Sequence, residues 1–124
     1  MTGYSPTLLD HFRSPRNRRS LQEFSGRGHD ENPVCGDQMT IWIRIEAGVV
    51  AEAGFEAYGC EPSIAAGSMV TTMVSGMAVA EAADITPEAI AVALGGLPPV
   101  KRHASMLASR VLRAAIDDSR RHGH

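Results

Sequence analysis

Two neighbouring stretches of the chain alternate between apolar and polar residues. The alternation runs from Gln38 to Glu46 and starts again from Val49 to Tyr58. A period of two residues is typical of β-strands with one buried face, and Ala47-Gly48 between them can form a turn. The pattern therefore predicts an antiparallel hairpin. Its expected inward side chains are Met39, Ile41, Ile43 and Ile45 in the first strand and Val49, Ala51, Ala53, Phe55 and Ala57 in the second.

After Cys60 the spacing of apolar residues changes to about 3.6, which is typical of helices. We expect helices at about 63–75, 78–83, 86–95 and 101–121, and Ser63 should cap the first of them. An N-terminal helix should begin at Ser5-Pro6 and end by Ser14, because Pro15 disfavours helical backbone in the residue before it. The last helix should bury one stripe, made of Val100, Ala104, Leu107, Val111 and Ala115.

Residues 15–34 are polar and rich in Arg, Gly and Asn, which predicts a long loop with at most one short strand. Strands followed by helices indicate an α+β fold. We expect a small antiparallel sheet, formed by the hairpin and a third strand, with helices packed on one face. A chain of 124 residues should form a single domain spanning residues 1–124.

The charge of the chain is nearly balanced, with 12 basic and 14 acidic residues. This balance argues against a nucleic-acid partner. The apolar runs are short and interrupted by Gly, Ser and Thr, so we expect no membrane span. The first residues have no basic region followed by an apolar stretch, and therefore do not resemble a secretory signal. The expected location is cytoplasmic.

Candidate chemistry lies in three short segments: Pro33 to Asp37, Tyr58 to Cys60, and Lys101 to His103. The first segment enters one hairpin strand and the second leaves its partner, so Cys35, Asp37 and Cys60 can converge at one end of the sheet. His103 joins them only if the last helix begins at that end. Thiolate, imidazole and carboxylate together suit zinc or iron. The plainer alternative is a loop cysteine, a buried cysteine, and Asp37 and His103 as turn and helix caps.

The order and spacing of these segments, along nearly the whole chain, resemble the IscU/NifU N-terminal family of iron–sulfur cluster assembly scaffolds. The matching segments are Tyr4 with DHFRSPRN (10–17), PVCGD (33–37), YGC (58–60) with SIAAGS (63–68), and LPPVKRH (97–103). The resemblance implies a site for a [2Fe–2S] cluster or Zn²⁺, with Cys35, Asp37, Cys60 and His103 at ligand positions. It also implies that a specialised Hsp70-type chaperone binds Leu97, Pro98, Pro99, Val100 and Lys101.

The family pattern places a third cysteine directly after the histidine, where this chain has Ala104. Alanine can neither bind a metal nor carry a persulfide. Three explanations stay open: Ala104 is an engineered substitution, or a natural one in a site with four other ligands, or the mark of a member that has lost assembly activity.

The first functional hypothesis is a non-enzymatic scaffold or carrier that holds a [2Fe–2S] cluster and passes it to apo iron–sulfur proteins. By resemblance, its other partners are a cysteine desulfurase, an Hsp70-type chaperone and a J-type co-chaperone. The alternative is a zinc-binding module that docks a desulfurase or chaperone without carrying a cluster. A thiol-dependent transferase with Cys60 as nucleophile and His103 as base is a third reading, for which the chain offers no oxyanion or substrate feature.

Overall fold

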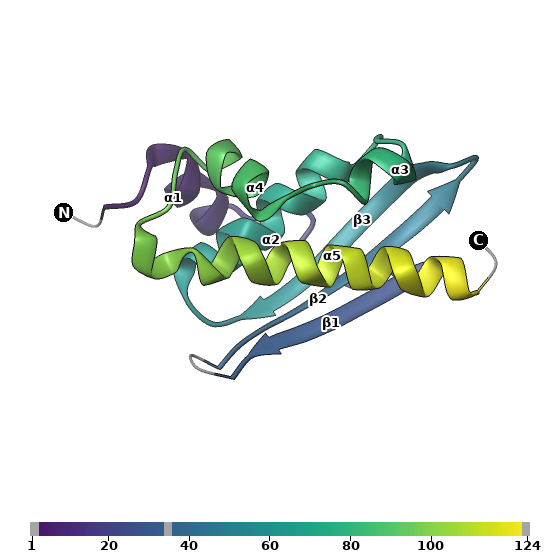
Figure 1. Cartoon of the computed structure of the whole chain (residues 1–124), viewed down its shortest axis with the longest axis horizontal. Coiled ribbons are helices and arrows are strands. Elements are labelled where there is room, and N and C mark those ends of the chain that lie inside the picture. Colours follow the sequence, from purple (N-terminus) through teal and green to yellow (C-terminus); the bar gives the residue numbers. More distant parts are fainter. Residues whose placement is uncertain (1–2, 34–35, 123–124) are drawn as a thin grey trace.

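The computed structural model describes residues 3–33 and 36–122, which form one sheet and a set of helices (Figure 1). The elements in chain order are α1 (Pro6–Arg13), β1 (Gly26–Asn32), β2 (Asp37–Glu46), β3 (Val49–Tyr58), α2 (Glu61–Val74), α3 (Val79–Ala82), α4 (Pro87–Ala93), a 3₁₀ turn η1 (Pro99–Lys101) and α5 (His103–Arg121). The strands form an antiparallel sheet in the order β1-β2-β3. The expected α+β class, with a hairpin and a third strand, is confirmed.

The tight turn between β2 and β3 consists of Ala47 and Gly48, as the alternation predicted. Both residues have positive φ, at 52° and 76° respectively. Two consecutive residues with positive φ are typical of a type I′ turn, whose twist matches that of the strands. Glycine adopts this backbone freely, whereas alanine does so at a cost.

At the start of β3, the residue that faces the core differs from the one predicted. A register irregularity falls between Arg44 and Ile45: Arg44 pairs with Glu52, whereas Ile45 pairs with Val50. Ala51 is consequently extra to the ladder and exposed, and Val50 is buried in its place. The prediction of Ala51 as an inward residue was wrong, because a bulge reverses the faces of the residues beyond it.

Strand β1 has no apolar alternation, and its place in the sheet depends on two glycines. Gly26 and Gly28 lie opposite the buried residues Ile43 and Ile41. A Cβ atom on Gly26 would lie 2.1 Å from the Ala115 carbonyl oxygen, and one on Gly28 would lie 2.3 Å from that of Val111. The glycines therefore allow α5 to lie directly against the strand.

Helices α2 and α5 cover one face of the sheet, and α5 follows its whole length (Figure 1). Ser5 caps α1 and Thr86 caps α4 through their side chains, and α1 ends before Ser14 as expected. Two details were predicted wrongly. The cap residue of α2 is Cys60 and not Ser63, and Val100 lies in η1 with 79 % of its surface exposed. The rest of the predicted α5 stripe is buried.

The other face of the sheet is crossed by the segment between α1 and β1. Arg18 and Arg19 pair with Glu56 and Glu52 of β3, and the buried side chain of Leu21 covers Gly54. In the part of the chain that the structure describes, no helix is both long and apolar enough to span a membrane.

Candidate metal centre

Three candidate ligands meet where β2 begins, β3 ends and α5 begins. Asp37 is the first residue of β2, Cys60 follows β3 as the cap residue of α2, and His103 is the first residue of α5. The hairpin brings the first two together, because the entrance of one antiparallel strand lies beside the exit of its partner. Helix α5 begins at this same end of the sheet (Figure 1), and so adds the histidine.

The separations of the three donor atoms match those around one metal ion. Asp37 Oδ2 lies 3.4 Å from Cys60 Sγ and 3.2 Å from His103 Nε2, and the sulfur lies 3.8 Å from the same nitrogen. Bonds of about 2.0–2.3 Å to one tetrahedral ion would place neighbouring donors roughly 3.3–3.6 Å apart. The donor set therefore fits a zinc or iron ion with little rearrangement.

Asp37 is held from several sides, and only 2 % of its surface is exposed. Its Oδ1 accepts a hydrogen bond from the Cys60 amide at 3.2 Å, and its Oδ2 accepts one from the Ser63 hydroxyl at 2.8 Å. Gly59, at φ +144°, allows this approach: a Cβ there would lie 2.0 Å from Asp37 Oδ1. The carboxylate is fixed before any ion arrives.

The protonation of the site follows from these contacts. Burial acts to raise the pKa of Asp37, but hydrogen bonds from Ser63 and Cys60 and the nearby His103 outweigh it, so the pKa lies below its ordinary value. Burial raises the pKa of the Cys60 thiol, and Asp37 raises it further against the opposing hydrogen bonds of Ser63. The resting site thus pairs a carboxylate with a protonated thiol, and a bound cation would have to displace that proton.

Sequence reasoning did not foresee that Ser63 bonds Asp37, nor that Gly59 makes room for the carboxylate of Asp37. Ser63 was assigned to helix capping, whereas its hydroxyl bonds Asp37. A usable signal was present, because Ser63 lies three residues after Cys60 and hence on the same side of the first helical turn. For Gly59, the signal was a glycine between a strand end and a cysteine.

The remaining predicted positions are placed as follows. Cys35 lies outside the described residues. Ala104 is completely buried in the first turn of α5, directly after His103. Of the segment from Leu97 to Lys101, Pro99 and Val100 are exposed, and the segment ends two residues before His103.

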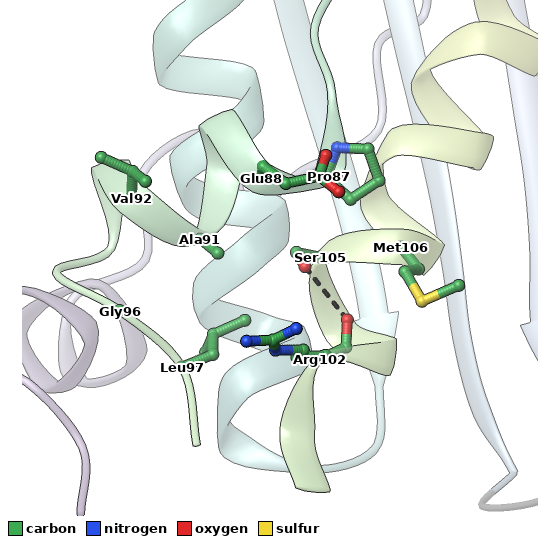
Figure 2. A pocket seen from close by; sticks show the side chains of 9 residues that line it. All are labelled: Pro87, Glu88, Ala91, Val92, Gly96, Leu97, Arg102, Ser105 and Met106. Carbon is green, nitrogen blue, oxygen red and sulfur yellow. Dashed lines mark hydrogen bonds between the residues drawn. The ribbon is translucent and has the colours of Figure 1, made fainter. Parts of the chain in front are cut away.

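A cavity of about 400 Å³ adjoins this segment, between α4 and the start of α5. Figure 2 shows its lining, to which Leu97, Arg102 and Met106 contribute. Ser105 also lines the cavity, but its hydroxyl donates a hydrogen bond to the carbonyl of Arg102 at the start of α5. None of the three metal-ligand candidates lines the cavity.

Comparison with known proteins identifies the family. Residues 3–123 match the NifU-like N terminal domain. The chain is 45 % identical over 115 residues to the iron-sulfur cluster assembly scaffold protein IscU 1 of Archaeoglobus fulgidus, covering 93 % of this chain and 75 % of that protein. The chain belongs to the IscU/NifU N-terminal family of iron–sulfur cluster assembly scaffolds. The family resemblance, together with the expectation of a non-enzymatic protein, is thereby confirmed.

Other relatives agree with this membership. The scaffold protein IscU of Aquifex aeolicus is 40 % identical over 117 residues, which cover 93 % of this chain and 74 % of that protein. The region that matches the family, residues 3–123, includes the segments that carry Asp37, Cys60 and His103. The absence of a cysteine at position 104 is therefore a departure within a family member and does not argue against membership.

Solved structures share the fold at low sequence identity. A SUF-system scaffold protein from Fervidobacterium islandicum superimposes with a TM-score of 0.76 at 17 % identity, covering 91 % of this chain and 96 % of that chain. A NifU-like N-terminal protein from Brucella abortus gives a TM-score of 0.63 at 19 % identity, covering 94 % and 89 % respectively. These likenesses show that the chain shares the fold of both structures.

Proposed function

We propose that this protein is a scaffold or carrier on which a [2Fe–2S] cluster is assembled or held before it passes to apo-proteins. The observation that carries the proposal is the triangle of Asp37 Oδ2, Cys60 Sγ and His103 Nε2, in which the three atoms lie within 4.8 Å of one another. Family membership supports iron–sulfur cargo for these donors. By position, Cys35 is the fourth candidate ligand.

The cluster is cargo, so its ligands must release it as well as hold it. A site with two cysteines, one histidine and one carboxylate can bind the irons of a [2Fe–2S] cluster, since histidine replaces cysteine on iron in other proteins. A carboxylate is a weaker ligand for iron than a thiolate, and a labile cluster suits a donor. Ala104 removes one route of sulfur delivery, because position 104 cannot carry a persulfide. Sulfur must therefore arrive by way of another group.

Zinc binding without a cluster is the second candidate function. The same triangle favours it, because the donor separations fit a single tetrahedral ion. One cysteine, one histidine, one carboxylate and a further thiolate would form the closed kind of site that is typical of structural zinc. In that case the protein would dock its partners without carrying a cluster.

Anaerobic reconstitution with iron and sulfide tests the first proposal. We expect the visible absorption of a [2Fe–2S] centre in the native chain, and its loss in Cys60→Ser and His103→Asn. His29→Asn is the matched control, because His29 bonds Thr40 between β1 and β2. A colourless native protein, or colour that survives Cys60→Ser, contradicts the proposal. Metal analysis that finds one tightly held zinc ion, which blocks reconstitution, favours the second function.

Partners follow from the family. We propose that a cysteine desulfurase docks around the N-terminal segment and the metal end, and that an Hsp70-type chaperone with a J-type co-chaperone acts on residues 97–101. Two prolines restrict the backbone of this segment, which reduces the entropy that it loses on binding. Pro99–Lys101 form the 3₁₀ turn η1, so capture in an extended groove would require this turn to open. Because this segment leads directly into His103, its capture would also disturb a candidate ligand.

A chaperone pull-down tests the proposed binding of the Hsp70-type chaperone to residues 97–101. Val100→Asp should weaken capture, because an exposed apolar side chain is replaced by a charge. Val92→Asp is a suitable control, since Val92 has 77 % of its surface exposed but lies outside the segment. Equal capture of both variants and the native chain would contradict chaperone binding at residues 97–101.

A further inference from the structure

Ser63 places a buried hydroxyl group beside the candidate metal ligands. It lies one helical turn into α2, and none of its surface is exposed. Its Oγ is 2.8 Å from Asp37 Oδ2 and 3.3 Å from Cys60 Sγ. These partners are side chains of candidate ligands and not backbone groups of α2, and the N-cap residue Cys60 makes no side-chain cap hydrogen bond. The hydroxyl therefore serves the site more directly than it serves the helix.

The two oxygens of Asp37 have different surroundings. Oδ1 accepts the Cys60 amide hydrogen and faces Gly59. Oδ2 lies 3.2 Å from His103 Nε2 and 3.4 Å from Cys60 Sγ, and is therefore the oxygen that faces the position of an ion. Ser63 donates to this second oxygen.

The hydrogen bond from Ser63 restricts how Asp37 can bind a cation. A carboxylate oxygen offers two lone pairs. The Ser63 proton takes one lone pair of Oδ2. The other faces the Cys60 thiol and His103, the two groups that would bind the ion together with Asp37, and becomes available to the ion when the thiol proton leaves. Because the Cys60 amide holds Oδ1, the carboxylate cannot rotate to bind through both oxygens without losing these bonds.

We propose that Ser63 is a positioning residue, which presents Asp37 to a zinc or iron ion as a ligand with a single oxygen. This inference rests on the proposed metal site and adds to it a residue outside the set of direct ligands. Groups that hydrogen-bond a metal ligand generally orient it, and removing one typically weakens metal affinity 10–100-fold. Ser63→Ala should have an effect of this size on metal binding and leave the fold intact, because alanine is smaller and favours helix.

Titration of the metal-free protein with Co²⁺ tests whether Ser63 positions Asp37 for metal binding. Four-coordinate Co²⁺ absorbs much more strongly in the visible region than six-coordinate Co²⁺, and a thiolate ligand adds a charge-transfer band. A competing chelator then gives the affinity. We expect binding to Ser63→Ala to be about 10–100-fold weaker than to the native chain. The control is Ser119→Ala, since Ser119 is equally buried but donates to the Ile116 carbonyl within α5. It should bind Co²⁺ like the native chain.

A double-mutant cycle separates positioning from a merely structural role. If Ser63 acts through Asp37, then adding Ser63→Ala to Asp37→Asn should change Co²⁺ affinity much less than it does in the native background. Equal effects in both backgrounds would overturn the inference, as would native affinity in Ser63→Ala. Circular dichroism of each variant verifies the fold.

The outcomes for Ser63 and for the metal site are distinguishable. Native protein that binds Co²⁺ with a thiolate band, which Cys60→Ser abolishes, supports the site whatever Ser63 does. Native affinity in Ser63→Ala would then overturn only the positioning role. If the native chain shows no thiolate–Co²⁺ band, the metal site itself is refuted, and the role of Ser63 with it.

Discussion

Gly59 allows the backbone at the end of β3 to pass directly beside the carboxylate of Asp37. The change Gly59→Ala would place a Cβ atom 2.0 Å from Asp37 Oδ1 and 2.6 Å from Asp37 Cγ. Real Cβ atoms do not approach other atoms so closely, so Asp37 or the strand end must move. We expect this variant to lose both stability and metal affinity.

The size of the effect has two parts. Holding a residue with a side chain at φ +144° costs about 1–3 kcal/mol. Displacing Asp37 breaks its hydrogen bonds from Cys60 and Ser63, and a hydrogen bond to a charged group contributes about 1.5–3 kcal/mol. Partial relaxation reduces the second part, so we expect it to add about 2–4 kcal/mol to the backbone cost.

Urea unfolding measures the loss of stability, and competition with a chelator for Co²⁺ measures the loss of metal affinity. Gly76→Ala is the matched control, because Gly76 has φ +86° but an added Cβ meets nothing within 4 Å. It should lose only the backbone part and keep native Co²⁺ affinity. Equal losses of stability in both variants, or native Co²⁺ affinity in Gly59→Ala, would refute the reasoning.

Three further expectations concern other parts of the chain. Ala47→Asn should raise the free energy of unfolding by about 0.5–1 kcal/mol, because asparagine tolerates positive φ better than alanine; an unchanged urea midpoint would contradict this. Ala104→Cys should raise the cluster content after reconstitution and allow sulfur to be accepted at position 104, and equal content speaks against a ligand role there. Burial, with help from Arg16 and against Asp10, lowers the pKa of His11. As the pH falls, His11 therefore takes up a proton in the unfolded chain before it does so in the folded chain, which favours unfolding. The free energy of unfolding should fall as the pH drops below about 6.5, and it should fall less steeply in His11→Asn.

Much of the fold could be predicted from local pattern. The alternation from Gln38 to Tyr58 predicted both strands of the hairpin and their turn, because one face of each strand is apolar. Capping residues and prolines predicted the starts of α1 and α4. In these elements each residue's environment is set mainly by neighbours in the sequence, so the sequence carries the signal.

Strand β1, by contrast, could not be predicted from the local sequence pattern. Its inward positions are Gly26 and Gly28, which carry no apolar signal. They lie inward because α5, almost ninety residues later in the chain, packs directly on them. The exposure of Ala51 has a different origin, since a bulge within the hairpin itself shifts the pairing at Ile45. The alternation of apolar residues does not reveal such a bulge, and the packing of α5 on the two glycines cannot be derived from residues nearby in the sequence.

The candidate site divides in the same way. The sequence by itself determined the donor types Asp37, Cys60 and His103, the family they indicate, and the missing thiol at position 104. Only the tertiary structure decided that α5 begins at the end of the sheet where β2 begins and β3 ends, and that Ser63 and Gly59 fix the carboxylate. The physical reason is that residue type limits which atoms can bind a metal, whereas the packing of distant elements decides which of those atoms lie within reach of one ion.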